Sequence, residues 1–168
     1  MKRNPKHAGE LAEIAFMGRA MGMGLIVTQP YGDNARYDFA VDNGKRFKRV
    51  QVKSCGALAK GRGSYNVNVG RHTARGAVPY LKSEIHAVAV LIVPEGRWYI
   101  LPWAALRGRV GLKIPSANAA KGGEFRKYAE AWGLLLGGRR RRLRGGISAS
   151  GVLRVEPRLV GARSACSR

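Results

Sequence analysis

The sequence predicts an α/β domain in which a mixed β-sheet is flanked by helices. Three observations favour this class. Apolar residues keep helical spacing near the N-terminus, alternating residues then surround a strong turn signal, and residues 86–93 form a continuous apolar run. Such a run is typical of a central strand that is covered on both faces.

The first helix is predicted over residues 5–21. Asn4 can cap the helix and Pro5 suits its first position, while Gly22 and Gly24 are expected to end it. Helical spacing places five apolar or small residues on one face, which we expect to pack on the sheet: Leu11, Ile14, Ala15, Gly18 and Met21.

Strand signals follow. Residues 25–27 indicate a short buried strand, and residues 36–41 and 47–53 alternate on either side of the turn sequence at 42–45, which predicts a hairpin. Residues 65–69 and 97–101 predict further strands, and residues 56–63 and 71–79 predict basic loops. Helical spacing from Phe125 to Leu135 predicts a C-terminal helix.

The chain carries 31 Lys and Arg against 10 Asp and Glu, a formal charge of +21. This surplus predicts a polyanionic partner, with nucleic acid the first candidate and a membrane surface the alternative. No apolar run is long enough for a transmembrane helix, and Glu10 and Glu13 interrupt any secretory signal, so we expect a cytoplasmic protein that joins the nucleoid when bound to DNA. Two distant cysteines and three scattered histidines disfavour a thiolate or imidazole site, which leaves a hard, oxygen-bound metal ion.

Two regions differ in composition. Residues 1–136 form the expected domain, whereas residues 137–168 carry nine Arg against one acid without any sustained period. We expect a flexible, Arg-rich tail that either holds the DNA backbone or is merely solvated.

Three polar side chains of the hairpin converge on one face. A two-residue loop pairs Asp38 with Arg49 and a four-residue loop pairs Asp38 with Gln51, but both registers leave Asp38 on the same face as Gln51 and Lys53. A carboxylate and an amide oxygen can hold Mg²⁺, or Mn²⁺ in its place, and a neighbouring lysine can orient a water for phosphodiester hydrolysis. From the first helix, Glu10 is expected to lean toward the sheet while Glu13 points away. An ordinary ion pair of Asp38 with Arg49 is the alternative.

This arrangement resembles the PD-(D/E)XK nuclease superfamily. Phrases at residues 30–34, 37–38, 49–53, 84–85, 98–100 and 128–132 are similar to its group I intron-associated homing endonuclease branch, over about residues 5–136. The resemblance implies a restriction-endonuclease-like core, Mg²⁺-dependent sequence-specific cleavage of double-stranded DNA, and a homo-oligomer, dimer or tetramer, that presents two active sites. It also implies that Asp38, Gln51 and Glu10 hold the metal and that Lys53 is catalytic. Gln51 replaces the usual acid, and Tyr37 stands where the superfamily has proline.

Basic residues that flank or follow the hairpin are expected to contact DNA phosphates: Arg36, Arg49, Lys60, Arg62, Arg71 and Arg75. Two other functions remain open at this point. One is a structure-selective nuclease that resembles Holliday junction resolvases, and the other is a catalytically inactive DNA-binding module of the same fold.

Overall fold

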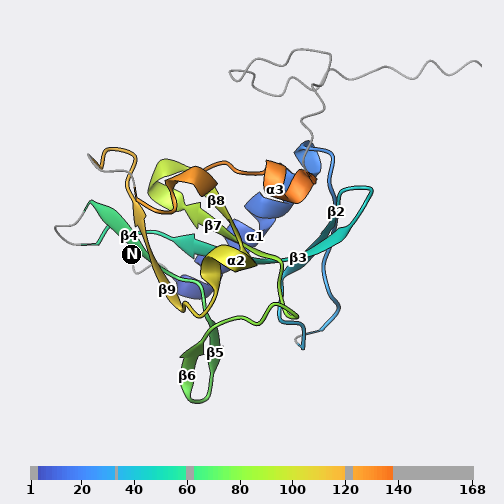
Figure 1. Cartoon of the computed structure of the whole chain (residues 1–168), viewed down its shortest axis with the longest axis horizontal. Helices are drawn as coiled ribbons and strands as arrows, with labels where there is room; N and C mark the ends of the chain where they lie inside the picture. The colour runs from blue at the N-terminus through green and yellow to red at the C-terminus, as the bar shows by residue number, and fades with distance from the viewer. Residues whose placement is uncertain (1–3, 33, 60–62, 120–122, 138–168) are drawn as a thin grey trace, which may run out of the picture.

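The computed structural model describes residues 4–32, 34–59, 63–119 and 123–137 and has a mixed sheet at its centre (Figure 1). Five strands form this sheet in the order β1 (Ile26–Thr28), β2 (Phe39–Asp42), β3 (Phe47–Cys55), β7 (Ala87–Ile92) and β8 (Arg97–Pro102). Neighbours are antiparallel except β3 and β7, which are parallel. The mixed sheet is confirmed, and the apolar run lies inside it as the buried strand β7.

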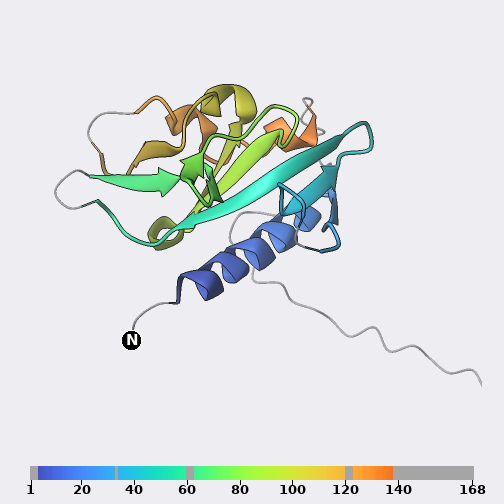
Figure 2. The same cartoon turned by 90° about the horizontal axis from the view of Figure 1, so that it is seen from below.

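The N-terminal helix, α1 (Pro5–Gly22), crosses one face of the sheet (Figure 2). Asn4 caps it by accepting a hydrogen bond from the N–H of Lys6, as predicted. The predicted packing face is wrong, however, because Ala12, Phe16 and Ala20 are the buried side chains. The face expected to be buried points to solvent.

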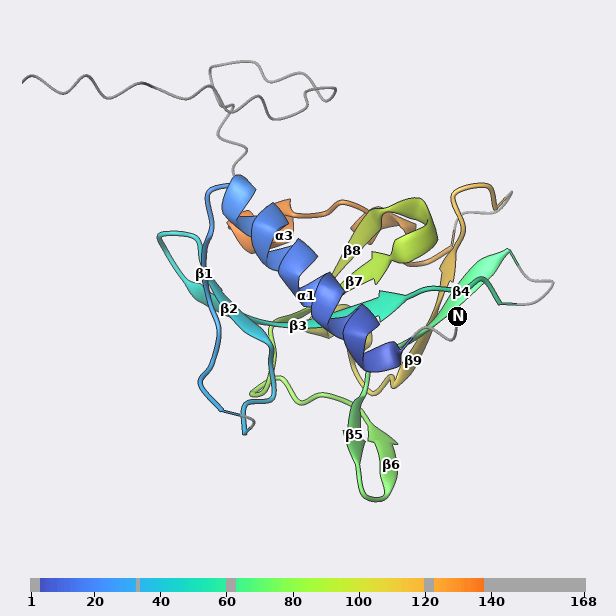
Figure 3. The same ribbon diagram turned by 180° about the vertical axis from the view of Figure 1, so that it is seen from behind.

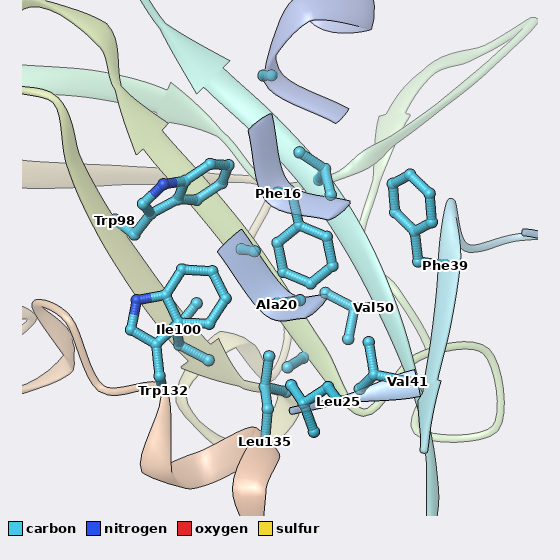
Figure 4. Packing of buried hydrophobic residues seen from close by; sticks show 14 residues of the cluster. Phe16, Ala20, Leu25, Phe39, Val41, Val50, Trp98, Ile100, Trp132 and Leu135 are labelled. Atoms are coloured by element: carbon cyan, nitrogen blue, oxygen red, sulfur yellow. The ribbon is translucent and has the colours of Figure 1, made fainter. Parts of the chain in front are cut away.

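An aromatic cluster explains which face of α1 is buried. The ring of Phe16 lies 5.5 Å from that of Phe39, 5.8 Å from Trp98 and 5.6 Å from Trp132, measured between ring centroids (Figure 4). Large aromatic rings in such contact contribute more than their buried area alone. Burial of Phe16 among these rings stabilises the fold more than burial of the aliphatic stripe on the other side of the helix would.

The second face of the sheet is covered by a smaller antiparallel pair, β4 (Ser64–Asn68) and β9 (Gly111–Pro115). Tyr65 and Ile114 of this pair are fully buried against β7 and β8. The strand at β4 was predicted, but β9, the short helix α2 (Trp103–Leu106) and the 3-10 turn η1 (Val93–Glu95) were not. Sequence 103–115 has no sustained period that would have indicated α2 or β9.

Residues 71–79, predicted as a basic loop, form a small hairpin of β5 (Arg71–Thr73) and β6 (Gly76–Val78) that projects from the body of the protein (Figure 1). The predicted C-terminal helix is broken into the 3-10 turn η2 (Arg126–Tyr128) and α3 (Gly133–Leu136). Glu130 interrupts it, with a φ of 49°, an N–H that donates to the Trp98 carbonyl, and a carboxylate that accepts from the Trp98 N–H.

The predicted tail after Gly137, together with Lys60 and Arg62, lies outside the described residues. None of the helices in the described part is long and apolar enough to span a membrane.

Candidate functional site

The turn between β2 and β3 selects one of the two registers. Asp42 pairs with Phe47, so the turn has four residues, and Phe39 pairs with Val50. Asn43 closes it, because its Oδ1 accepts from the N–H groups of Lys45 and Arg46. Asp38 therefore lies opposite Gln51, and the pairing of Asp38 with Arg49 does not occur.

The carboxylate of Asp38 is held where β2 and β3 separate. Its own N–H donates to the Val50 carbonyl, and β3 then continues past the start of β2. Asp38 Oδ2 accepts from the N–H of Val52 at 2.7 Å and from Nε2 of Gln51 at 2.5 Å. The strand edge thus fixes the carboxylate in one position, and Gln51, which is 8% exposed, is locked beside it.

A pocket of about 230 Å³ brings Asp38 together with Glu13 of α1. The chain before β2 forms the rest of its lining with Gln29, Pro30, Gly32, Ala35 and Tyr37. Burial raises the pKa of Asp38, although hydrogen bonds and Lys53 oppose this rise. Burial also raises the pKa of Glu13, and the charges of Asp38 and Glu10 add to it. Two carboxylates that disfavour each other's charge face one pocket, which suits a cation.

The helix carboxylate at the site is Glu13 and not Glu10. The prediction that Glu13 points away from the sheet is wrong, because α1 buries Ala12 and Phe16 and each helical residue turns the chain by about 100°. Glu13 is consequently half-buried beside that face. Glu10 is exposed, and its Oε2 lies 3.8 Å from His7 Nδ1. Sequence spacing missed Glu13 because it assigned the wrong stripe to the core.

Lys53 follows Gln51 by two residues on β3, so the two side chains leave the same face of the strand. Lys53 is half-buried, and its positive charge lowers the pKa of both Asp38 and Glu13. Its charge is therefore felt by both carboxylates. The predicted set of Asp38, Gln51 and Lys53 is brought together, with Glu13 as the added member.

The predicted phosphate-binding residues are not equivalent. Arg36 is exposed in the segment before β2, and Arg75 is exposed at the turn of the β5–β6 hairpin. Arg49 is half-buried, and its buried Nε has no hydrogen-bond partner among the described residues. Arg71 lies 3.4 Å from the Glu84 carboxylate, so its charge is already paired within the fold.

Oxygen donors at the site fit a hard divalent cation. No group of three His, Cys, Asp or Glu side chains is found in the described part of the chain, so a metal would rely on amide and backbone oxygens as well. Gln51 Nε2 lies between Asp38 Oδ2 and the Val52 carbonyl oxygen, at 2.5 and 3.5 Å. Rotation of this amide by a half turn would put Oε1 in the place of Nε2, beside the Asp38 and Val52 oxygens. The three oxygens would then face one point, and Mg²⁺ and Mn²⁺ prefer oxygen ligands.

A larger hollow of about 910 Å³ lies elsewhere, between β4, β9 and the segment around Phe125. Its only carboxylate, Glu124, is held by a two-pronged ion pair with Arg109 at 3.0 and 3.1 Å. It brings none of the facing carboxylates together, so the smaller pocket is the candidate active site.

Comparison with known proteins identifies the family and the fold. A family model described as PD-(D/E)XK endonuclease matches residues 3–135. A solved structure titled as that of a bacterial homing endonuclease, I-Ssp6803I, matches with a TM-score of 0.70 and 26% identity, over 80% of this chain and 94% of that chain. No curated protein gives a significant match. The restriction-endonuclease-like fold is thereby confirmed, and the chain belongs to the PD-(D/E)XK endonuclease family as a DNA endonuclease.

Proposed function

We propose that this protein is a homing-type endonuclease, which hydrolyses both strands of double-stranded DNA at a specific sequence and depends on Mg²⁺, with Mn²⁺ as a substitute. It acts in the cytoplasm as a homo-oligomer, dimer or tetramer, since two cuts need two active sites. One observation carries the proposal: the Asp38 carboxylate is fixed by Gln51 and Val52 and shares a pocket with Glu13. The similarity to a bacterial homing endonuclease supports the choice of this branch.

Asp38, Gln51 and Glu13 are the residues that would hold the metal. Glu10, which the sequence suggested for this role, is exposed on the helix beside His7. When bound, the ion neutralises the scissile phosphate and lowers the pKa of a water molecule. Because Gln51 is neutral, the two carboxylates supply all the negative charge of the site, and the loss of either should weaken metal binding.

Lys53 has a separate role in the proposal. Its ammonium group, near both carboxylates, orients the attacking water and stabilises the negative charge that develops on the phosphate. DNA phosphates are bound by Arg36, Arg49 and Arg75.

The test combines cleavage with a matched set of variants. The purified full-length protein is incubated with a DNA library and with its own genomic neighbourhood, in Mg²⁺ and in EDTA, and the new ends are sequenced. Lys53→Ala and Asp38→Asn should abolish cleavage at the single site, whereas Lys45→Ala, an exposed lysine in the hairpin turn, should leave it unchanged.

Three outcomes would contradict the proposal. Cleavage of a four-way junction in preference to any linear site would indicate a structure-selective nuclease. Tight DNA binding without cuts in any metal would indicate an inactive module of the same fold. Cleavage that survives in both Lys53→Ala and Asp38→Asn would place the active site elsewhere.

A further inference from the structure

Helix α1 has a second apolar stripe that its own fold does not use. This outer stripe consists of Leu11, Ile14, Gly18 and Met21, and its three large side chains are 53%, 61% and 58% exposed. It lies opposite the buried stripe, and the described part of the chain places no element over it (Figure 3). A surface helix normally has one apolar face toward the core and a polar face opposite it, so a second apolar stripe departs from that pattern.

Gly18 is unexplained by packing within the chain. A Cβ added there would meet nothing within 4 Å, so no neighbour in the described fold requires a glycine. Glycine is the poorest helix former after proline, and it is retained in helices where another backbone approaches closely. The outer stripe therefore combines large side chains that project with a hollow that can receive one.

Charge distinguishes this helix from the rest of the molecule. From Pro5 to Gly22 it carries Lys6 and Arg19 against Glu10 and Glu13, a net charge of zero (2 minus 2), in a chain of +21. A neutral apolar surface does not attract DNA, and an anionic membrane needs several basic residues beside the apolar stripe. A second copy of this chain, strongly basic elsewhere, meets no repulsion here.

We propose that the outer stripe of α1 is the surface on which a second copy of this chain packs, helix against helix. An interface between identical copies must be self-complementary, and the stripe supplies both the projecting Leu11 and Ile14 and the hollow at Gly18. Such an interface would bring together the two active sites that the proposed function needs. Only this consequence, and not the interface itself, rests on the proposed function.

The size of the stripe suits the centre of an interface. Its exposed side chains present on the order of a few hundred Å² of apolar surface, as much as the largest patch on a typical monomer. A stable contact buries about 800 Å² per partner around an apolar centre with a polar rim. His7, Glu10 and Arg19, all exposed, flank the stripe as that rim.

The test measures the mass of the full-length protein by sedimentation and light scattering, without DNA or Mg²⁺. The wild type should have a mass that is two or four times 18.3 kDa. Ile14→Lys combined with Met21→Lys should give 18.3 kDa or weaken association at least tenfold, and Gly18→Leu should weaken it as well. Leu81→Lys, 58% exposed between β6 and β7, is the matched control and should keep the wild-type mass.

Unfolding temperatures at low concentration decide whether the variants still fold, since all three positions face solvent in a single copy. A wild-type mass of 18.3 kDa at every concentration would overturn the inference, as would an oligomer that the α1 variants leave intact. Binding of a monomer to phosphatidylserine vesicles through the same residues would also overturn it. A protein that associates through α1 but cuts no DNA would instead refute the proposed function alone.

Discussion

Replacing Gln51 by glutamate tests the proposed metal site with almost no change in side-chain size. Gln51 is 8% exposed, and its Nε2 donates to Asp38 Oδ2 at 2.5 Å. A glutamate places a carboxylate oxygen at that contact. The hydrogen bond is lost and two negative charges meet where water is largely excluded, so the metal-free protein should be destabilised.

The magnitude follows from two contributions. A hydrogen bond to a charged group is worth about 1.5–3 kcal/mol. The two carboxylates can then share a proton, which relieves their repulsion. The remaining loss of folding free energy is about 1.4 kcal/mol for each unit by which the pKa of the pair is raised. We expect Gln51→Glu to lower the free energy of unfolding by about 2–4 kcal/mol at neutral pH, and the Tm by roughly 2–4 °C for each kcal/mol. A raised folded-state pKa means that this loss shrinks as the pH falls.

Thermal and urea unfolding in EDTA and in Mg²⁺ measure the effect. Gln51→Met is the matched control, because it loses the hydrogen bond without adding charge. Mg²⁺ should stabilise the glutamate variant most and the methionine variant least, since binding to the folded state alone stabilises it in proportion to affinity. A glutamate variant as stable as the wild type in EDTA, or equal stabilisation of all three proteins by Mg²⁺, would refute the reasoning.

Three further predictions concern single side chains. Glu13→Gln should reduce Mg²⁺-dependent cleavage by about 10–100-fold, as is usual when a group that supports a metal site is lost. Glu10→Gln should leave cleavage unchanged. Equal effects of the two substitutions in a single-turnover cleavage assay would contradict the choice of Glu13. Phe16→Ala should lower the free energy of unfolding in urea by about 3–5 kcal/mol, because Phe16 is fully buried among three aromatic rings. A loss below about 1 kcal/mol would argue against that core. Burial lowers the pKa of His86, helped by Arg49, and its neutral Nδ1 accepts from the Arg49 N–H at 2.9 Å. The stability that His86 contributes is present above its ordinary pKa of 6.5 and is lost as the pH falls through the lowered value, so the Tm of the wild type should drop on acidification more than that of His86→Gln. Equal slopes in thermal melts would exclude this role.

Much of the site was predictable because strands repeat every two residues. Either register of the hairpin leaves Asp38, Gln51 and Lys53 on one face, so the constellation did not depend on the turn length. The central strand β7 was predictable for a similar reason, since a strand covered on both faces must be apolar throughout. Pairing between distant segments was not predictable in this way. β9 pairs with β4, although strands β5 to β8 lie between them in the sequence, and its short sequence has no pattern that identifies its partner.

Contacts between distant residues decided the length of the hairpin turn and the break in the C-terminal helix. Asn43 closes a four-residue turn, and its Nδ2 also donates to the Leu135 carbonyl of α3, which ties the turn to the far end of the domain. Glu130 breaks a helix that its neighbours favour, because its N–H and carboxylate are both used by Trp98. Local spacing contains no information about either contact.

The sequence by itself determined the fold class, the central strand and the convergence of Asp38, Gln51 and Lys53, because each depends only on the periodicity of one strand or one hairpin. Only the tertiary structure decided which stripe of α1 is buried, and hence that Glu13 and not Glu10 faces the site. The helix has apolar residues on both sides, so its spacing is equally consistent with either orientation. The rings of Phe39, Trp98 and Trp132, which come from three other segments, select the side that carries Phe16.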